Sequence, residues 1–264
     1  MNEKVRMIII IVIGIYLLIC VLLYFLQENL LFFPEKLPSN FEFDFVEEFE
    51  EVNIEVEDEI VLNNVHFKSN NNRGVVLFFH GNGGSIYHWG QGSNIYLERG
   101  YDVFYVDYRN YGKSGGKIES ESQLINDGQI IYDYLRSKYS EEDIIVSGTS
   151  IGTGIAVQIA SKNSPNKLIL NSPYYSLPSL VKEKLFWVPR FIIRYKLKTF
   201  KHIKEVECSI IIIHGNEDQL IPIEHANKLK EENPEIDLTT IKNCGHNDLF
   251  QSYEYLEKMK MILN

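Results

Sequence analysis

Three side chains in this chain have the types and the order needed for attack on a carbonyl group: Ser150, Asp218 and His246. A serine hydroxyl is a weak nucleophile at neutral pH, so it needs a neighbouring base and a group that orients that base. In one established arrangement the serine comes first along the chain, the acid second and the histidine last. His246 would then take the serine proton through one ring nitrogen, while Asp218 holds the hydrogen of the other.

The serine lies in the sequence Gly148-Thr149-Ser150-Ile151-Gly152, which fits the G-x-S-x-G pattern of a nucleophile elbow. In this sharp strand-to-helix turn a Cβ at either glycine would collide with nearby backbone. The pattern alone is common, because glycine and serine are abundant residues. Here the β-branched run 144–146 precedes it and a small-residue stretch typical of a helix follows, so the context favours an elbow.

A glycine-rich segment, residues 80–84 with the sequence HGNGG, follows directly after the apolar run 75–79. Its glycines allow backbone N–H groups to face a developing oxyanion. We expect the N–H groups of Asn82 and Ile151 to form this oxyanion hole. His80 and His214 each follow an apolar run and precede a glycine, and we interpret both as structural turn residues.

Two other carboxylates compete with Asp218 for the role of the acid. Glu217 comes one residue too early, and Asp248 is interpreted as the cap of the final helix, whose apolar stripe begins at Leu249. The remaining histidines lack a set of partners, and we interpret them as surface residues: His88, His202 and His225.

The elements that must position these residues follow from the hydrophobic pattern. Short apolar runs alternate with helical stretches, which predicts parallel strands buried on both faces with helices on both sides. The strands are expected at 75–79, 103–106, 144–146, 167–170, 210–213 and 238–241, and an antiparallel edge pair at 52–56 and 60–67. Two helical faces are expected from Leu124, Gly128, Ile131 and Leu135, and from Leu249, Tyr253, Leu256 and Leu263. Ser150, Asp218 and His246 then share one edge of the sheet.

Residues 174–206 interrupt the alternation and contain a basic stretch without a clear strand. We expect a short, partly helical cap over the carboxyl ends of the strands, where ligands bind in open α/β folds. A packed surface helix pair without a substrate role is the alternative. Four aromatic residues would supply an apolar wall for an acyl group, although core packing is an equal alternative for each: Tyr174, Tyr175, Phe186 and Trp187.

The N-terminal segment 7–26 is twenty residues long and carries no charge. This length crosses a hydrocarbon core of about 30 Å. No small-residue cleavage site follows, as a signal peptide would require, and a buried core helix is rarely apolar all round. We therefore predict an uncleaved membrane anchor at 1–28, a membrane-proximal linker at 29–49 and a hydrolase domain at 50–264. Lys4 and Arg6 precede the span, which places the N-terminus in the cytoplasm and the domain outside.

The composition excludes several other classes of protein. The formal charge of −10 disfavours nucleic acid as a partner, because phosphates would be repelled. The three cysteines show no metal-ligand spacing, and we expect no metal site. Cys208 and Cys244 flank successive predicted parallel strands at opposite ends, too far apart for a disulfide.

At this point the chain resembles the α/β-hydrolase superfamily over about residues 50–263. It is most similar to the small membrane-anchored, abhydrolase-domain serine hydrolases near the prolyl-oligopeptidase-like branch. The resemblance rests on residues 80–84, 107–116, the elbow at 150, 214–218 with 221–222, and 245–248, and the segment 28–34 resembles the membrane-proximal segment of that subgroup.

The resemblance implies an eight-stranded, mostly parallel sheet, a Ser-His-Asp triad and acyl-transfer hydrolysis without a cofactor. Cys208 and Asn110 depart from the residues that relatives often have, proline and glycine, but neither departure touches the chemistry. In this family the block at 107–116 is mainly a structural turn.

These observations predict a membrane-anchored serine hydrolase that cleaves esters or thioesters of small-molecule or lipid-like substrates. A serine peptidase of the prolyl-oligopeptidase-like type is an alternative, since the same triad cleaves amides. The sequence shows no paired glutamates to hold a peptide amino terminus. A catalytically silent binding protein on the same fold is a further alternative.

Overall fold

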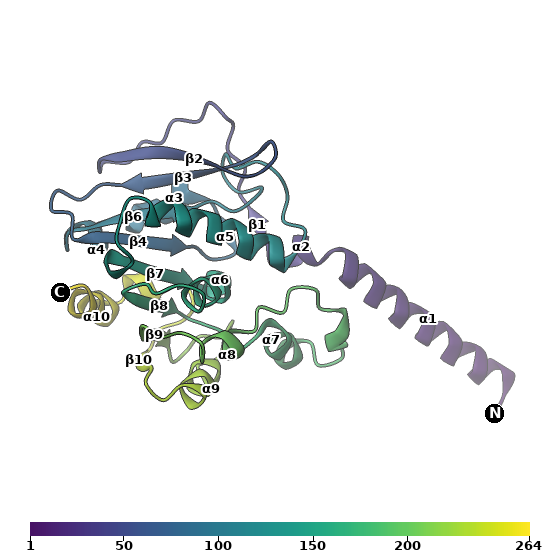
Figure 1. The fold of residues 1–264 in the computed structure, drawn as a ribbon. Coiled ribbons are helices and arrows are strands. Elements are labelled where there is room, and N and C mark those ends of the chain that lie inside the picture. Colours follow the sequence, from purple (N-terminus) through teal and green to yellow (C-terminus); the bar gives the residue numbers. More distant parts are fainter.

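An eight-stranded sheet forms the centre of the protein in this computed structural model, which describes residues 1–264 (Figure 1). The strands lie in the order β10-β9-β8-β7-β4-β6-β3-β2, and β3 alone runs against its neighbours. Their bounds are β2 Phe49–Glu57, β3 Ile60–Phe67, β4 Gly74–Phe79, β6 Tyr101–Val106, β7 Ile144–Thr149, β8 Lys167–Asn171, β9 Ser209–Gly215 and β10 Asp237–Ile241. The mostly parallel sheet and its antiparallel edge pair confirm the prediction.

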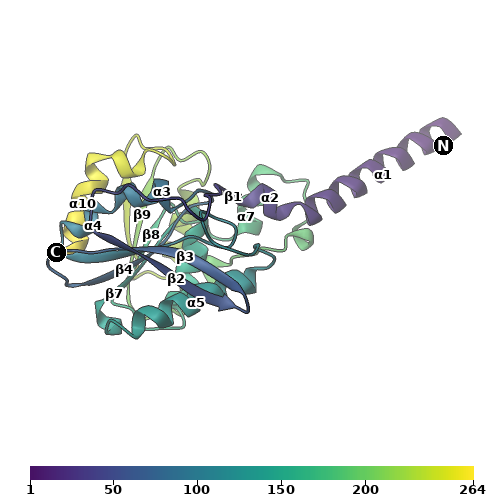
Figure 2. The same cartoon turned by 90° about the horizontal axis from the view of Figure 1, so that it is seen from above.

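Helices cover both faces of the sheet, because alternate side chains of a strand point to opposite sides. In β4, Leu77 faces one hydrophobic core and Phe78 faces the other. Figure 2 shows α3, α4 and α10 on one face and α5 on the other. The helices on the Phe78 side are α3 Ile86–Trp89, α4 Asn94–Leu97 and α10 Tyr253–Leu263, and those on the Leu77 side include α5 Glu121–Arg136, α6 Thr153–Ala160 and α9 Glu224–Glu232.

The predicted apolar face of α5 is confirmed, and the predicted face at the end of the chain is confirmed at Leu249, Leu256 and Leu263 but not at Tyr253. Tyr253 is 74% exposed, whereas Tyr255, Met259 and Leu263 are buried. Leu249 belongs to a separate turn, and the extended backbone of Ser252 interrupts the helical path before α10 begins. Tyr253, the first residue after this break, therefore lies outside the buried face.

The insertion between β8 and β9 is partly helical. It contains α7 (Leu177–Lys184), a short 3₁₀ turn at Arg190–Ile192 and α8 (Thr199–His202). One surface assignment was wrong, because His225 of α9 is fully buried under this insertion. Its Nε2 lies 3.0 Å from Glu183 Oε2 on α7, and its Nδ1 accepts a hydrogen bond from the backbone N–H of Tyr175. Burial lowers the pKa of His225, so the imidazole is held in its neutral form.

The N-terminal helix α1 (Glu3–Phe25) projects away from the domain in both views (Figures 1 and 2). At 1.5 Å per residue it is about 34 Å long. Its length and apolar composition suit a membrane span and equally suit a signal sequence. A short helix, α2 (Gln27–Leu31), connects it to the domain.

The segment expected to be a linker is bound to the domain. Strand β1 (Phe33–Pro34) pairs in parallel with β5 (Gly83–Gly84), and Lys36 forms a bridge with Gly112. Phe43 is buried in the hydrophobic core on the Phe78 side of the sheet. The chain leaving α1 is therefore joined directly to the loop that follows β4.

Candidate active site

Ser150 lies at the turn between β7 and α6, in a left-handed backbone conformation with φ of 53°. Residues other than glycine rarely adopt this conformation. The glycines around it have a steric explanation. A Cβ on Gly152 would lie 2.2 Å from the carbonyl oxygen of Phe79, and one on Gly148 would lie 2.7 Å from the carbonyl oxygen of Gly152. Backbone atoms thus leave no room for a side chain at position 148 or 152.

We expect Gly152→Ala to destabilise the protein by about 1–3 kcal/mol, because the new methyl group would overlap backbone oxygens that cannot move aside. The melting temperature should fall by several degrees. Gly83→Ala is the matched control, since a Cβ there meets no atom within 4 Å. Equal melting temperatures for the two variants would contradict the steric explanation.

The structure brings Ser150, Asp218 and His246 together. His246 Nε2 lies 3.1 Å from Ser150 Oγ, and His246 Nδ1 lies 2.6 Å from Asp218 Oδ2. The three residues follow β7, β9 and β10, whose carboxyl ends meet at one edge of the sheet. With its Nδ1 hydrogen donated to Asp218, the imidazole has Nε2 free to accept the serine proton. This arrangement can activate a serine hydroxyl for attack on a carbonyl carbon.

Asp218 is held as a carboxylate by its surroundings. Its Oδ1 accepts hydrogen bonds from the backbone N–H groups of Leu220 (2.9 Å) and Ile221 (2.8 Å), and its Oδ2 lies 3.4 Å from His214 Nε2. Burial by itself would raise the pKa of Asp218. Hydrogen bonds from His214, His246 and Ile221 outweigh burial and hold that pKa well below its usual value. The carboxylate therefore remains charged beside the imidazole at neutral pH.

The two carboxylates that competed with Asp218 do not contact the imidazole of His246 in place of it. Glu217 is exposed to solvent. Asp248 Oδ2 accepts a hydrogen bond of 3.1 Å from the N–H of Gly245, so it folds the loop that carries His246. The prediction that Asp248 caps the final helix was wrong, because α10 begins only after Ser252.

The other two candidate histidines lie inside the fold. His80 and His214 are both fully buried. His80 Nε2 lies 3.2 Å from Asp107 Oδ1, and His214 Nε2 lies 2.8 Å from the carbonyl oxygen of Ile221. Burial raises the pKa of Asp107. His80 thus links the loop after β4 to the loop after β6, and His214, at the end of β9, bonds to the loop that follows it.

The loop at residues 81–84 lies directly beside the serine, since a Cβ on Gly81 would be 3.8 Å from Ser150 Cβ. The carbonyl of Asn82 accepts two hydrogen bonds, from the N–H of Phe33 (2.8 Å) and from the hydroxyl of Tyr111 (2.6 Å). The N–H of Asn82 donates no hydrogen bond within the protein. This N–H is therefore available to a ligand oxygen. The two hydrogen bonds to the carbonyl hold the backbone of Asn82 in place.

Sequence reasoning did not identify Phe33 and Tyr111 as supports of this loop. Both lie in segments that carried the family resemblance, 28–34 and 107–116, but nothing local pairs either of them with Asn82. Asn110, in the second segment, has a φ of 71°. Asparagine tolerates this left-handed conformation better than most residues, so it can stand where relatives often have glycine.

We expect Tyr111→Phe to lower kcat about tenfold with little change in KM. One lost hydrogen bond of about 1.4 kcal/mol would loosen the Asn82 peptide, and that energy corresponds to a factor of ten in rate. Tyr132→Phe is the control, since its hydroxyl bonds to Glu141 elsewhere in the fold. Steady-state kinetics on an ester substrate measure both parameters. An unchanged kcat would rule out a positioning role for Tyr111.

Of the four aromatic residues expected to form an acyl wall, the structure brings Tyr174 to the elbow. Tyr174 is buried, and its hydroxyl donates a 3.0 Å hydrogen bond to the carbonyl of Ile151. Tyr175 stacks on Phe200. Phe186 and Trp187 lie on the outer surface of the cap, where they are 84% and 41% exposed.

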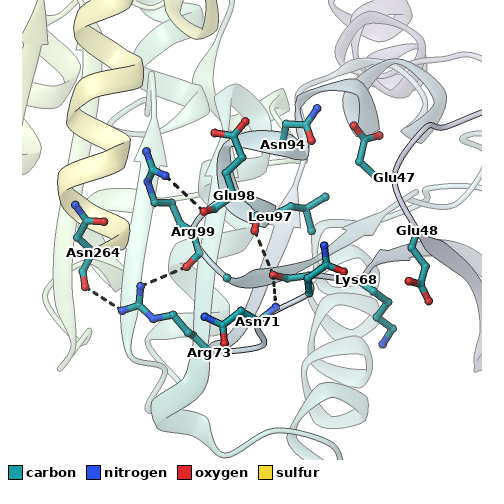
Figure 3. A pocket seen from close by; sticks show the side chains of 13 residues that line it. Glu47, Glu48, Lys68, Asn71, Arg73, Asn94, Leu97, Glu98, Arg99 and Asn264 are labelled. Carbon is teal, nitrogen blue, oxygen red and sulfur yellow. Dashed lines mark hydrogen bonds between the residues drawn. The ribbon is translucent and has the colours of Figure 1, made fainter.

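An open surface pocket of about 620 Å³ lies elsewhere (Figure 3). It surrounds Arg73, which donates hydrogen bonds to the backbone oxygens of Arg99, Leu263 and Asn264. Arg73 and Gly100 precede β4 and β6, so this pocket is at the amino ends of the strands, opposite the edge that carries Ser150. No group of three or more metal-ligating side chains is present.

Comparison with known proteins identifies the family. The sequence profile described as serine aminopeptidase, S33, matches residues 70–204, which is about half of the chain. The chain belongs to this family of α/β-hydrolases. The matched range includes the elbow and the loop at 81–84.

The α/β-hydrolase domain-containing protein 17C of Xenopus tropicalis is 32% identical to the chain over 204 residues. The match covers 73% of this chain and 62% of that protein, so the chain spans about three fifths of the length of such relatives.

Solved structures show the same fold. An esterase of Pyrococcus furiosus matches with a TM-score of 0.71 and 21% identity, over 88% of this chain and 96% of its own. A monoacylglycerol lipase of Paleococcus ferrophilus matches with a TM-score of 0.58 and 17% identity, over 76% and 96%. The chain therefore has the α/β-hydrolase fold, preceded by an apolar helix.

Proposed function

We propose that the chain is a serine hydrolase that cleaves carboxylic ester or thioester bonds through an acyl-enzyme intermediate. The observation that carries the proposal is the position of His246, with one ring nitrogen 3.1 Å from Ser150 Oγ and the other 2.6 Å from Asp218. The membership of a hydrolase family supports it.

In this mechanism Ser150 Oγ attacks the carbonyl carbon of the substrate while His246 Nε2 takes the hydroxyl proton. The oxyanion of the tetrahedral intermediate accepts hydrogen bonds from the N–H groups of Asn82 and Ile151. His246 then gives its proton to the leaving alcohol or thiol, and the acyl group stays on Ser150. A water molecule repeats the attack, with His246 again as base and then acid, and releases the carboxylic acid. The scheme uses only side chains, backbone amides and water, so it needs no cofactor.

We further propose that α1 is a single-pass membrane anchor with its N-terminus in the cytoplasm and the domain outside. The charges of Lys4 and Arg6 before the span support this orientation. Because β1 joins α2 directly to the loop at 81–84, the active-site edge lies next to the membrane-proximal segment. A lipid-like ester in the bilayer is therefore a suitable substrate.

Incubation of the detergent-solubilised chain with a fluorophosphonate probe tests the proposal. Labelling of Ser150 is expected, and an unlabelled chain would point to a silent binding protein on the same fold. A series of p-nitrophenyl esters of rising chain length, compared with aminoacyl and peptide reporters, then tests the bond type. The family description favours the peptidase as the second candidate, so faster turnover of peptides than of esters would replace the esterase proposal.

A further inference from the structure

The cap exposes apolar side chains next to α1. We call residues 185–191, which follow α7, the cap tip. Within it Phe186 and Phe191 are 84% and 85% exposed, and Leu185 and Trp187 are each 41% exposed. Four exposed large apolar side chains within seven residues of a folded domain indicate an interaction site.

The cap tip is attached to α1 itself. The hydroxyl of Tyr16 donates a 3.1 Å hydrogen bond to the carbonyl of Trp187. Val188 and Ile192 pack against Cys20 in a small buried cluster. Figures 1 and 2 both show the cap beside the part of α1 that leads into α2. The tip therefore extends along the apolar helix and away from the sheet.

The contacts with α1 determine how deep the cap tip would lie in a membrane that α1 spans. Tyr16 precedes the end of α1 at Phe25 by nine residues, or about 14 Å at 1.5 Å per residue. Helical side chains lean toward the N-terminus, so the hydroxyl of Tyr16 lies at least as far from Phe25 as its Cα does. A hydrocarbon layer of about 30 Å that covers the apolar length of α1 also covers the carbonyl of Trp187.

The backbone of the cap tip is suited to an apolar environment, where unpaired polar groups are costly. The N–H of Val188 donates to the carbonyl of Leu185 (2.9 Å), and the N–H of Ile192 donates to the carbonyl of Pro189 (3.2 Å). The carbonyl of Ile192 accepts from Gln27 Nε2 at 2.8 Å. Pro189 has no N–H. Internal bonds and proline thus remove several of the polar groups that insertion would strand.

The charge around the cap tip complements an anionic membrane surface. Residues 182–204 contain eight lysines and arginines and one acidic residue, although the whole chain carries −10. Six of the basic side chains are exposed and have no acidic partner, and three of these six lie in the tip or directly before it: Lys182, Lys184 and Arg190. Lysine and arginine side chains close to an anionic bilayer are attracted to its surface. Their long side chains can place the charge among headgroups while the stems stay in the apolar layer.

We propose that the cap tip inserts beside α1 into a bilayer that contains anionic phospholipids, as a second membrane contact that holds the active-site edge against the lipid. The proposal rests on the membrane location proposed above for α1. It needs no assumption about the reaction at Ser150.

Tryptophan quenching in lipid vesicles tests the insertion. The chain has two tryptophans, Trp89 and Trp187. We would reconstitute the full chain in vesicles of phosphatidylcholine and phosphatidylglycerol with brominated acyl chains, which quench tryptophan in contact with lipid. In the wild type, most of the Trp187 emission should be quenched. The Trp187→Phe variant, which retains only Trp89, should show no quenching. Equal fractional quenching in the two proteins would overturn insertion of the tip.

Two further experiments test the role of anionic lipid and the effect of the cap tip on the hydrolysis of membrane-bound substrate. Omission of phosphatidylglycerol should weaken the quenching, and unchanged quenching would overturn the role of anionic lipid. Phe191→Ser, at a position that is 85% exposed, should raise KM severalfold for an ester embedded in vesicles and leave turnover of a water-soluble ester unchanged. If the variant and the wild type had equal KM values for the vesicle-embedded ester, the cap tip would not hold the active-site edge against the lipid.

The failures of the separate proposals remain distinguishable. Chains that do not float with vesicles would overturn the anchor and the cap-tip contact together. Flotation without quenching of Trp187 would overturn the cap-tip contact alone. Quenching in a chain that fluorophosphonate does not label would support the membrane contact and overturn only the hydrolase proposal.

Discussion

Replacement of Ser150 by alanine should lower kcat for ester hydrolysis about 10⁶-fold and abolish labelling by fluorophosphonate. Alanine removes the only atom that bonds to the acyl group, and His246 then has no hydroxyl proton to take. Because the loss concerns the chemical step, KM should change little. Initial rates over a range of substrate concentrations give kcat and KM, and gel detection of the probe measures the labelling.

Ser161→Ala is the matched control for this experiment. Its hydroxyl donates to the carbonyl of Gln158 at the end of α6, so it lies just after the helix that follows the elbow and outside the triad. Full activity and labelling are expected for this variant. A Ser150→Ala protein that keeps its melting temperature and still hydrolyses the ester would show that another nucleophile carries the reaction.

Asp218→Asn should lower kcat about 10⁴-fold at neutral pH. The amide can still accept the hydrogen bonds of Leu220 and Ile221 through its oxygen, so the loop keeps its shape. Its NH₂ group then faces His246 Nδ1 and donates where the carboxylate accepted. The imidazole must carry its hydrogen on Nε2, which leaves it unable to take the proton of Ser150.

Glu217→Gln is the matched control, since it removes a neighbouring carboxylate that is exposed, whereas the carboxylate paired with His246 is that of Asp218. Steady-state kinetics and melting temperatures of both variants separate a loss of chemistry from a loss of fold. A large drop in kcat for Glu217→Gln with normal activity for Asp218→Asn would assign the orienting role to the other acid.

Local patterns in the sequence were enough to predict the sheet and its direction. Runs such as 75–79 and 210–213 are apolar throughout, as strands buried on both faces require, and the alternating runs at 52–56 and 60–67 belong to the edge pair. The position of the elbow could also be predicted, because the steric demand on Gly148 and Gly152 is expressed within five residues. Parallel strands bring their carboxyl ends to one edge, so chain order alone placed Ser150, Asp218 and His246 near each other.

Sequence patterns were less informative about which side chains are buried. In the apolar stripe assigned from Leu249 onward, Tyr253 is exposed because Ser252 interrupts the helical path directly before it. His225 was interpreted as a surface residue because its partner, Glu183, is 42 positions away and belongs to α7. A one-dimensional pattern contains no record of which distant side chain will cover a residue.

By itself, the sequence determined the apolar helix, the strands and the order of the candidate catalytic residues, since each depends on neighbours within a few positions. Only the tertiary structure decided that Phe33 and Tyr111 hold the carbonyl of Asn82, and that the cap tip lies against Tyr16 of α1. These contacts join segments 29 to 171 residues apart. Their geometry depends on how the whole sheet twists and where each loop returns, which is set by packing of the complete chain.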